Sequence, residues 1–151
     1  MNIGGFQKSS LIDYPGKLSC ILFLTGCNFD CPYCHNPDLV RAGAGFPSVI
    51  DSAQLEAFLA RRQGLLDGVV ITGGEPTLQS DLTELCRTIK DKGFSIKLDT
   101  NGSRPKILGQ LIAEGLIDYV AMDLKTDPNR YAPLISKTCK PETIRDSVQT
   151  I

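Results

Sequence analysis

The chain has 151 residues, of which 42% are hydrophobic and 22% are charged, and its net charge is −1. These values are ordinary for a globular protein with a hydrophobic core, so we expect residues 1–151 to form one domain. A balanced charge argues against nucleic-acid and membrane-surface partners. The sequence shows no secretory signal pattern and no membrane-spanning apolar stretch, so we expect a cytoplasmic protein.

Short apolar runs alternate with amphipathic segments along the chain. The runs rich in β-branched, leucine or aromatic residues are predicted strands, and they cover 18–25, 68–72, 94–99 and 117–123. Capping residues or prolines predict helices that begin at Asp51 or Ser52, Ser80, Pro105 and Pro141. This alternation predicts an α/β fold built from parallel βα units.

Four loops that follow predicted strands carry unusual residues: 26–37, 73–77, 100–102 and 124–128. Right-handed crossovers place every loop that leaves a parallel strand at the same edge of the sheet. We therefore expect these loops to surround one pocket, although about a hundred residues separate the first from the last.

The chain contains six cysteines, and three of them, Cys27, Cys31 and Cys34, lie within eight residues. A reducing compartment disfavours a disulfide framework, so closely spaced thiols predict a metal site. Cys20 and Cys86 fall in apolar patterns and are predicted core residues. The pattern gives no assignment for the sixth cysteine.

Three thiolates suit soft metals and iron–sulfur clusters, and on a four-iron cluster they leave one iron open to a substrate. A closed zinc site that includes His35 is an alternative, although adjacent side chains such as Cys34 and His35 diverge. A c-type haem site would need export, and a redox pair would leave one thiol unused. We therefore predict that His35 is not a metal ligand.

The spacing Cys27-x-x-x-Cys31-x-x-Cys34, with an aromatic residue before the last cysteine, resembles the signature of radical S-adenosylmethionine (SAM) enzymes. The resemblance implies a partial parallel (βα) barrel and a 4Fe–4S cluster on these three catalytic cysteines. It also implies that SAM chelates the open iron and is cleaved by one electron. The products would be methionine and a 5′-deoxyadenosyl radical that abstracts hydrogen.

The later loops resemble the family's cofactor-binding elements, although on their own the first two would indicate only turns and the third a charged pair at the surface. The string Gly-Gly-Glu-Pro at 73–76 resembles the element that binds the amino group of SAM through backbone carbonyls and a glutamate. Two further strings, at 99–102 and 123–125, resemble those of glycyl-radical-enzyme activating proteins. The resemblance implies these cofactor-binding residues: Tyr33, Asn36, Gly73, Gly74, Glu75, Asp99, Asn101, Asp123 and Lys125. The alternative for the two aspartates is a shared cation.

Residues 5–17, together with 34–37, resemble the activating protein of anaerobic ribonucleoside-triphosphate reductase. The resemblance implies formation of a glycyl radical on that reductase, with a flavodoxin- or ferredoxin-type electron donor. The alternatives are activation of pyruvate formate-lyase, a small-molecule radical reaction, or a non-catalytic iron–sulfur or zinc module.

Such proteins usually build a six-stranded partial barrel, whereas this sequence supplies about four βα units. We therefore expect either a chain truncated at its C-terminus or an unusually short relative, with weak or absent turnover. The strand at 117–123 would then have a free edge. We expect that edge either to mediate self-association or to be covered by the N-terminal segment or the last helix.

Overall fold

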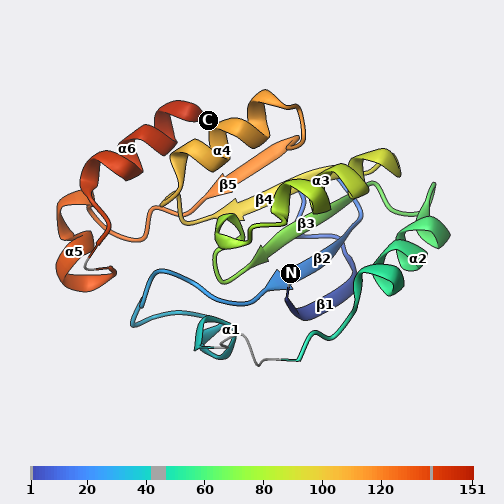
Figure 1. Cartoon of the computed structure of the whole chain (residues 1–151), viewed down its shortest axis with the longest axis horizontal. Coiled ribbons are helices and arrows are strands. Elements are labelled where there is room, and N and C mark those ends of the chain that lie inside the picture. Colours follow the sequence, from blue (N-terminus) through green and yellow to red (C-terminus); the bar gives the residue numbers. More distant parts are fainter. Residues whose placement is uncertain (1, 42–46, 137) are drawn as a thin grey trace.

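The computed structural model describes residues 2–41, 47–136 and 138–151 (Figure 1). One sheet has the strand order β1-β2-β3-β4-β5. Its strands are β1 Ile3–Ser10, β2 Ser19–Leu24, β3 Gly68–Gly73, β4 Ser95–Thr100 and β5 Tyr119–Met122. Strands β2 to β5 are parallel to one another, which confirms the predicted α/β class.

Strand β1 was not predicted from the sequence, and it pairs antiparallel with β2. Only its end residues, Ile3 and Ser10, are buried, while the residues between them are partly or fully exposed. The strand therefore lacks the apolar alternation that identifies a strand in a sequence. Its pairing with β2 places the N-terminal segment at the sheet edge opposite β5.

The predicted helices correspond to α2 Ser52–Arg62, α3 Leu82–Asp91, α4 Pro105–Ala113 and α6 Pro141–Thr150. Asp51 caps α2: its carboxylate accepts from the Gln54 N–H at 2.7 Å, and the Gln54 side chain accepts from the Asp51 N–H at 3.1 Å. The predicted cap at Ser80 is wrong. A turn closed by the Leu82 N–H and the Gln79 carbonyl delays the helix, so Asp81 occupies the cap position.

Shorter elements complete the chain: α1 Pro37–Arg41, α5 Tyr131–Leu134 and the 3₁₀ turns η1 Pro76–Leu78 and η2 Pro128–Arg130. Within the described residues, no helix combines the length and the apolar character needed to cross a membrane.

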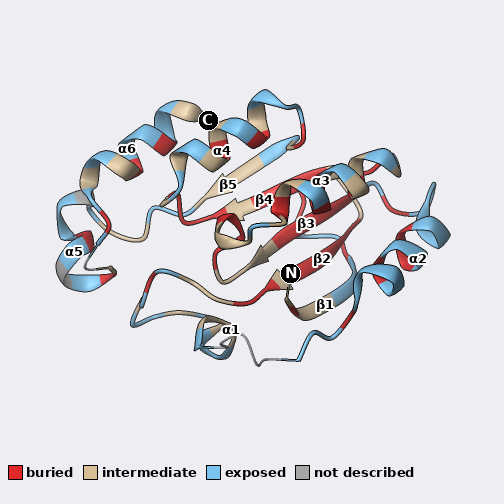
Figure 2. Ribbon diagram, in the orientation of Figure 1, coloured by how far each residue is buried: buried red, intermediate tan, exposed pale blue. Residues whose placement is uncertain are grey.

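The main hydrophobic core lies between one face of the sheet and helices α2, α3 and α4 (Figure 2). Burying a large aliphatic side chain in such a core stabilises the fold by about 1.5–3 kcal/mol. Cys20 and Cys86 lie in this core and are 0% exposed, as predicted. Burial raises the pKa of both thiols to about 12, which keeps them protonated and unreactive.

A second cluster contains the cysteine that the sequence left unassigned. Cys139 packs with Phe29, Tyr131, Ile135 and Ile144, and the partly buried Cys27 and Cys31 lie against the same cluster. Residues from α5 and α6 thus support the loop that carries the predicted cluster cysteines.

The opposite face of the sheet is covered mainly at the amino ends of the strands. Tyr14, from the loop after β1, is 3% exposed and packs with Ile21 and Val70. A Cβ added at Gly68 would lie 3.0 Å from the Tyr14 ring, so glycine permits this close approach. The carboxyl ends of the strands are left for the loops that surround the site.

The free edge of β5 has one neighbour, β4, within the described sheet. Strand β1 pairs at the opposite edge, and α6 packs against α4. The Tyr14 ring lies 6.0 Å from the Tyr119 ring on β5, but among the described residues no backbone hydrogen bond joins the N-terminal segment to this strand. We therefore expect the chain to self-associate through the unpaired backbone groups of β5. Light scattering over a dilution series measures the mass, and a monomer at every concentration would contradict this prediction.

Candidate cofactor site

A cavity of about 310 Å³ lies at the carboxyl ends of the parallel strands. Its walls come from the loop after β2 and from the ends of β3, β4 and β5 (Figure 1). Three predicted cluster cysteines and eight of the nine predicted cofactor residues line it: Cys27, Cys31, Cys34, Tyr33, Asn36, Gly73, Gly74, Asp99, Asn101, Asp123 and Lys125. The ninth residue, Glu75, lies behind the wall.

All three cysteines of the loop are free and partly exposed. Burial raises the pKa of Cys27 and of Cys31, while the Lys125 ammonium acts to lower that of Cys31. Across the described part of the chain, no three His, Cys, Asp or Glu side chains are arranged to hold a single metal ion. Three thiols on the wall of one open cavity are nevertheless the donor set that fits an iron–sulfur cluster with one open iron.

His35 is an exposed residue beside Cys34 and also lines the cavity. The expectation that it is not a metal ligand stays a prediction. Spectroscopy that detected a nitrogen ligand lost in His35→Gln would contradict it.

The residues directly after β3, Gly74 and Glu75, join the ends of β2 and β3. Gly74 N–H donates to the Leu24 carbonyl at 2.8 Å, and Glu75 N–H donates to the Gly26 carbonyl at 2.8 Å. A Cβ at Gly74 would lie 1.9 Å from the Gly26 oxygen. The sequence interpretation assigned Gly74 to making space for SAM, but the closest constraint is the backbone next to Cys27.

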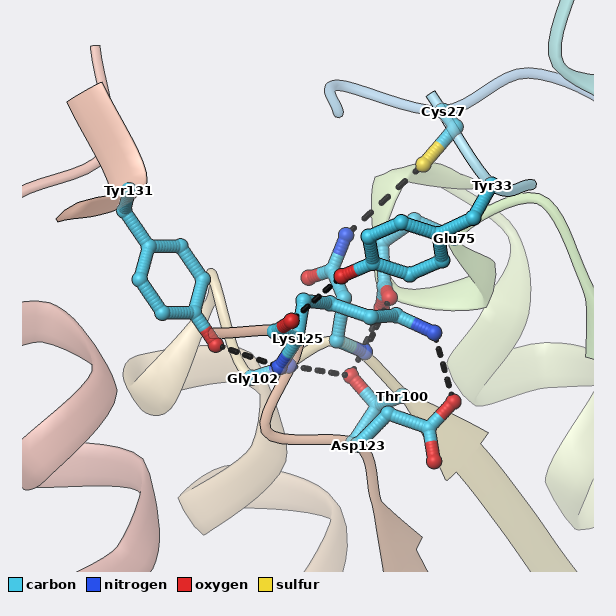
Figure 3. Close-up of polar contacts among 9 residues, drawn as sticks. Cys27, Tyr33, Glu75, Thr100, Gly102, Asp123, Lys125 and Tyr131 are labelled. Carbon is cyan, nitrogen blue, oxygen red and sulfur yellow. Dashed lines mark hydrogen bonds and ion pairs between the residues drawn. The ribbon is translucent and has the colours of Figure 1, made fainter. Parts of the chain in front are cut away.

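Glu75 is 0% exposed, and its carboxylate joins the β3 loop to the end of β4 (Figure 3). Its Oε1 accepts from the Thr77 N–H at 3.1 Å and from the Thr100 hydroxyl at 2.8 Å, and the Thr77 hydroxyl also donates to it. Its Oε2 accepts from the Asn101 N–H at 2.7 Å. Burial raises the pKa of Glu75, and these hydrogen bonds oppose that rise.

The buried position of Glu75 adds a structural role to the one inferred from the sequence. The resemblance implied that its carboxylate contacts the amino group of SAM, yet the carboxylate is occupied by four donors from the protein. The carboxylate thus ties the loop to Thr100 and Asn101 on the cavity wall, and its contact with SAM stays a prediction.

The two aspartates of the cavity each have a lysine partner. Lys97, which is 8% exposed on β4, forms an ion pair with Asp99. Burial raises the pKa of Asp99, while the hydrogen bond and charge of Lys97 act to lower it. Lys125 Nζ lies 2.6 Å from Asp123 Oδ2. The sequence interpretation did not identify Lys97 as the partner of Asp99. Residues two apart in a strand lie on the same face, so their spacing could have indicated the pair.

Two tyrosine hydroxyl groups form hydrogen bonds with the backbone of Lys125 (Figure 3). Tyr33 donates to the Lys125 carbonyl, and the Lys125 N–H donates to the Tyr131 hydroxyl at 2.9 Å. The Tyr131 ring lies 5.7 Å from the Phe29 ring, centroid to centroid. Tyr131 was missed because no sequence motif marks it; only its contacts connect it to the cysteine loop.

Gly74→Ala is expected to reduce both stability and iron binding. The added Cβ must displace the Gly26 carbonyl beside Cys27, and overpacking of this kind costs about 1–3 kcal/mol. Chemical denaturation and iron content after anaerobic reconstitution measure the two effects. Gly109→Ala in α4 is the control, because its Cβ meets a Thr150 methyl group at 3.3 Å. Equal stability and equal iron content in the two variants would show that the close contact between Gly74 and the Gly26 carbonyl is not needed.

Glu75→Gln is expected to destabilise the chain by about 1–3 kcal/mol. The substitution replaces one carboxylate oxygen with an NH₂ group, so a buried N–H or O–H group that donated to this oxygen loses its acceptor. Denaturant midpoints measure the loss. Glu56→Gln is the matched control, since its side chain is 51% exposed and lies 3.4 Å from Lys92, an exposed pair worth about 0–1 kcal/mol. A smaller loss at Glu75 than at Glu56 would show that the buried tie is not needed.

The sequence profile of the radical SAM superfamily matches residues 21–151. Over 150 residues the chain is 39% identical to "Putative glycyl-radical enzyme activating enzyme MJ1227" of Methanocaldococcus jannaschii, which covers 99% of this chain and 60% of that protein. It is 31% identical over 141 residues to a pyruvate formate-lyase-activating enzyme of Clostridium pasteurianum, covering 89% of this chain and 57% of that protein.

A solved structure with the same fold is that of TYW1 with a lysine–pyruvate adduct bound. The TM-score is 0.54 at 17% sequence identity, over 87% of this chain and 50% of that chain. The chain thus spans little more than half the length of the curated relatives named above. The matched profile, the strand order and the cysteine loop together show that the chain belongs to the radical SAM superfamily.

Proposed function

We propose that this chain carries the cluster and SAM sites of an enzyme that forms a glycyl radical on a partner enzyme. The observation that carries the proposal is the placement of Cys27, Cys31 and Cys34 on one cavity with the ends of three parallel strands. The name of the M. jannaschii relative supports the same class of activity.

When bound, the cluster supplies the electron that cleaves SAM into methionine and a 5′-deoxyadenosyl radical. The thiolates of Cys27, Cys31 and Cys34 would hold the cluster and would leave one iron for the cofactor. The Lys125 ammonium is suited to bind a carboxylate, although Asp123 already engages it at 2.6 Å. Phe29 and Val40 add apolar surface to the wall and limit access of water to a reactive radical.

For the partner, we propose anaerobic ribonucleoside-triphosphate reductase, with a flavodoxin- or ferredoxin-type protein as electron donor in the cytoplasm. Support comes from the resemblance of residues 5–17. This stretch forms β1 and the loop whose Tyr14 packs at the amino ends of the strands, away from the cavity. It therefore supports the choice of partner and not the chemistry of the site.

Activation of pyruvate formate-lyase is a second candidate function. It is favoured by the relative from C. pasteurianum, whose name gives that activity. The cavity residues serve the same chemistry for either partner, so the two candidates differ in the protein that receives the radical.

The cluster assignment predicts that replacing any one of Cys27, Cys31 or Cys34 with Ala abolishes stable cluster assembly. Removing one thiolate leaves a second iron without a protein ligand. Iron content and the visible absorbance after anaerobic reconstitution measure the loss. Cys86→Ala is the control, because that thiol is 0% exposed in the core. Equal iron content in all four variants, or a colourless protein with one zinc, would contradict the assignment.

The activity is tested by anaerobic incubation of the reconstituted chain with SAM, dithionite and the candidate reductase. Electron paramagnetic resonance detects a glycyl radical, and the reductase with its radical glycine changed to alanine is the control. A radical on the unchanged reductase supports the proposal. A radical on pyruvate formate-lyase alone would establish the second candidate. Because weak turnover is already expected of a chain that covers 60% of its relative, a four-iron protein that does not bind SAM is the result that would overturn both.

A further inference from the structure

Asn101 lies at the end of β4, beside the first cysteine of the cluster loop. Its side-chain Nδ2 is 3.7 Å from Cys27 Sγ, within hydrogen-bond range for sulfur. We infer that Asn101 helps to set the reduction potential of the cluster by donating this hydrogen bond to Cys27. The inference rests on the proposed binding of a cluster at the three cysteines.

Cys27 differs from the other two cysteines in the donors that reach its sulfur. The Phe29 backbone N–H is 3.4 Å from Cys27 Sγ, so two N–H groups are directed at one atom. Among the hydrogen bonds of the described residues, no side chain donates to the sulfur of Cys31 or Cys34. The environment of the three sulfurs is therefore asymmetric.

The orientation of the Asn101 amide is fixed by its neighbours. The Ser103 backbone N–H donates to Asn101 Oδ1 at 2.9 Å, which identifies that atom as the oxygen. The nitrogen then faces Cys27 and also donates to Asn28 Oδ1 at 3.1 Å. The backbone is held as well, because the Asn101 N–H donates to buried Glu75 at 2.7 Å. Rotating the Asn101 amide by half a turn would point its NH₂ group at the Ser103 N–H, so that two donors would face each other.

These contacts also refine the role of Asn101 on the cavity wall. Both polar atoms of its amide already have protein partners, and the residue is 5% exposed. A direct polar contact with SAM would have to displace one of them. Its Nδ2 is instead directed at Cys27, which makes Asn101 a positioning and tuning residue.

A hydrogen bond to a cluster sulfur stabilises negative charge on that sulfur. The cluster gains one electron on reduction, so the hydrogen bond strengthens in the reduced state and raises the potential. Loss of the donor therefore lowers the potential. We expect the ratio of reduced to oxidised cluster at a fixed potential to fall by roughly tenfold, which corresponds to 59 mV for a one-electron couple.

The test is a redox titration with dithionite as electron donor, followed by electron paramagnetic resonance of the reduced cluster. Asn101→Ala removes the amide, and Asn101→Asp keeps its shape but replaces the donor with oxygen. Ser103→Ala is the matched control: it removes the hydroxyl that contacts Asn28 and keeps the backbone N–H that holds Asn101. We expect a lower potential in both Asn101 variants and none of this shift in the control.

The outcomes separate this inference from the proposed function. An unchanged chain that fails to assemble four irons refutes the cluster itself. Four-iron variants with unchanged potential refute only the role of Asn101, as does an equal shift in Ser103→Ala. A shift in Asn101→Asp without one in Asn101→Ala also refutes it, because added charge would then be the cause. If the alanine variant does not retain a cluster, Asn101→Leu decides, because it keeps a side chain of similar size with neither the donor nor an added charge.

Discussion

The buried carboxylate of Glu75 links the loop after β3 to the end of β4, and the geometry of the cavity depends on this link. It fixes the Asn101 backbone, and the Asn101 amide in turn reaches Cys27. The same loop begins at Gly74. The backbone of Gly74 packs against Gly26, which immediately precedes Cys27. Burying a charged group without hydrogen-bond partners costs free energy. The four donors around the Glu75 carboxylate offset that cost and allow it to be buried.

The parallel sheet explains why residues far apart in the chain meet at one cavity. Helices α2, α3 and α4 cover one face of the sheet, and Tyr14 fills the other face at the amino ends of the strands. The carboxyl ends are left to the loops, as in other α/β proteins. The ion pairs Lys97–Asp99 and Lys125–Asp123 then balance the acidic groups brought there by β4 and β5.

The sequence predicted the parts of this structure that depend on local pattern. Buried parallel strands produce apolar runs, and the spacing of the cysteines identifies the loop after β2, so the cavity and most of its wall were predicted. Strand β1 was missed because only its two ends are buried. The burial of Glu75 and the contact of Tyr131 with Lys125 depend on long-range packing, which no local motif records. The Ser80 cap was wrong because the turn after η1 displaces the start of α3.

We propose that the cavity at the strand ends holds a cluster with one iron open to SAM. The most direct measurement is electron–nuclear double resonance of the reduced, reconstituted chain with SAM labelled with nitrogen-15 in its amino group. We expect hyperfine coupling between the cluster and the labelled nitrogen, because the amino group would bind the open iron. A four-iron cluster that shows no such coupling at saturating SAM would contradict the claim.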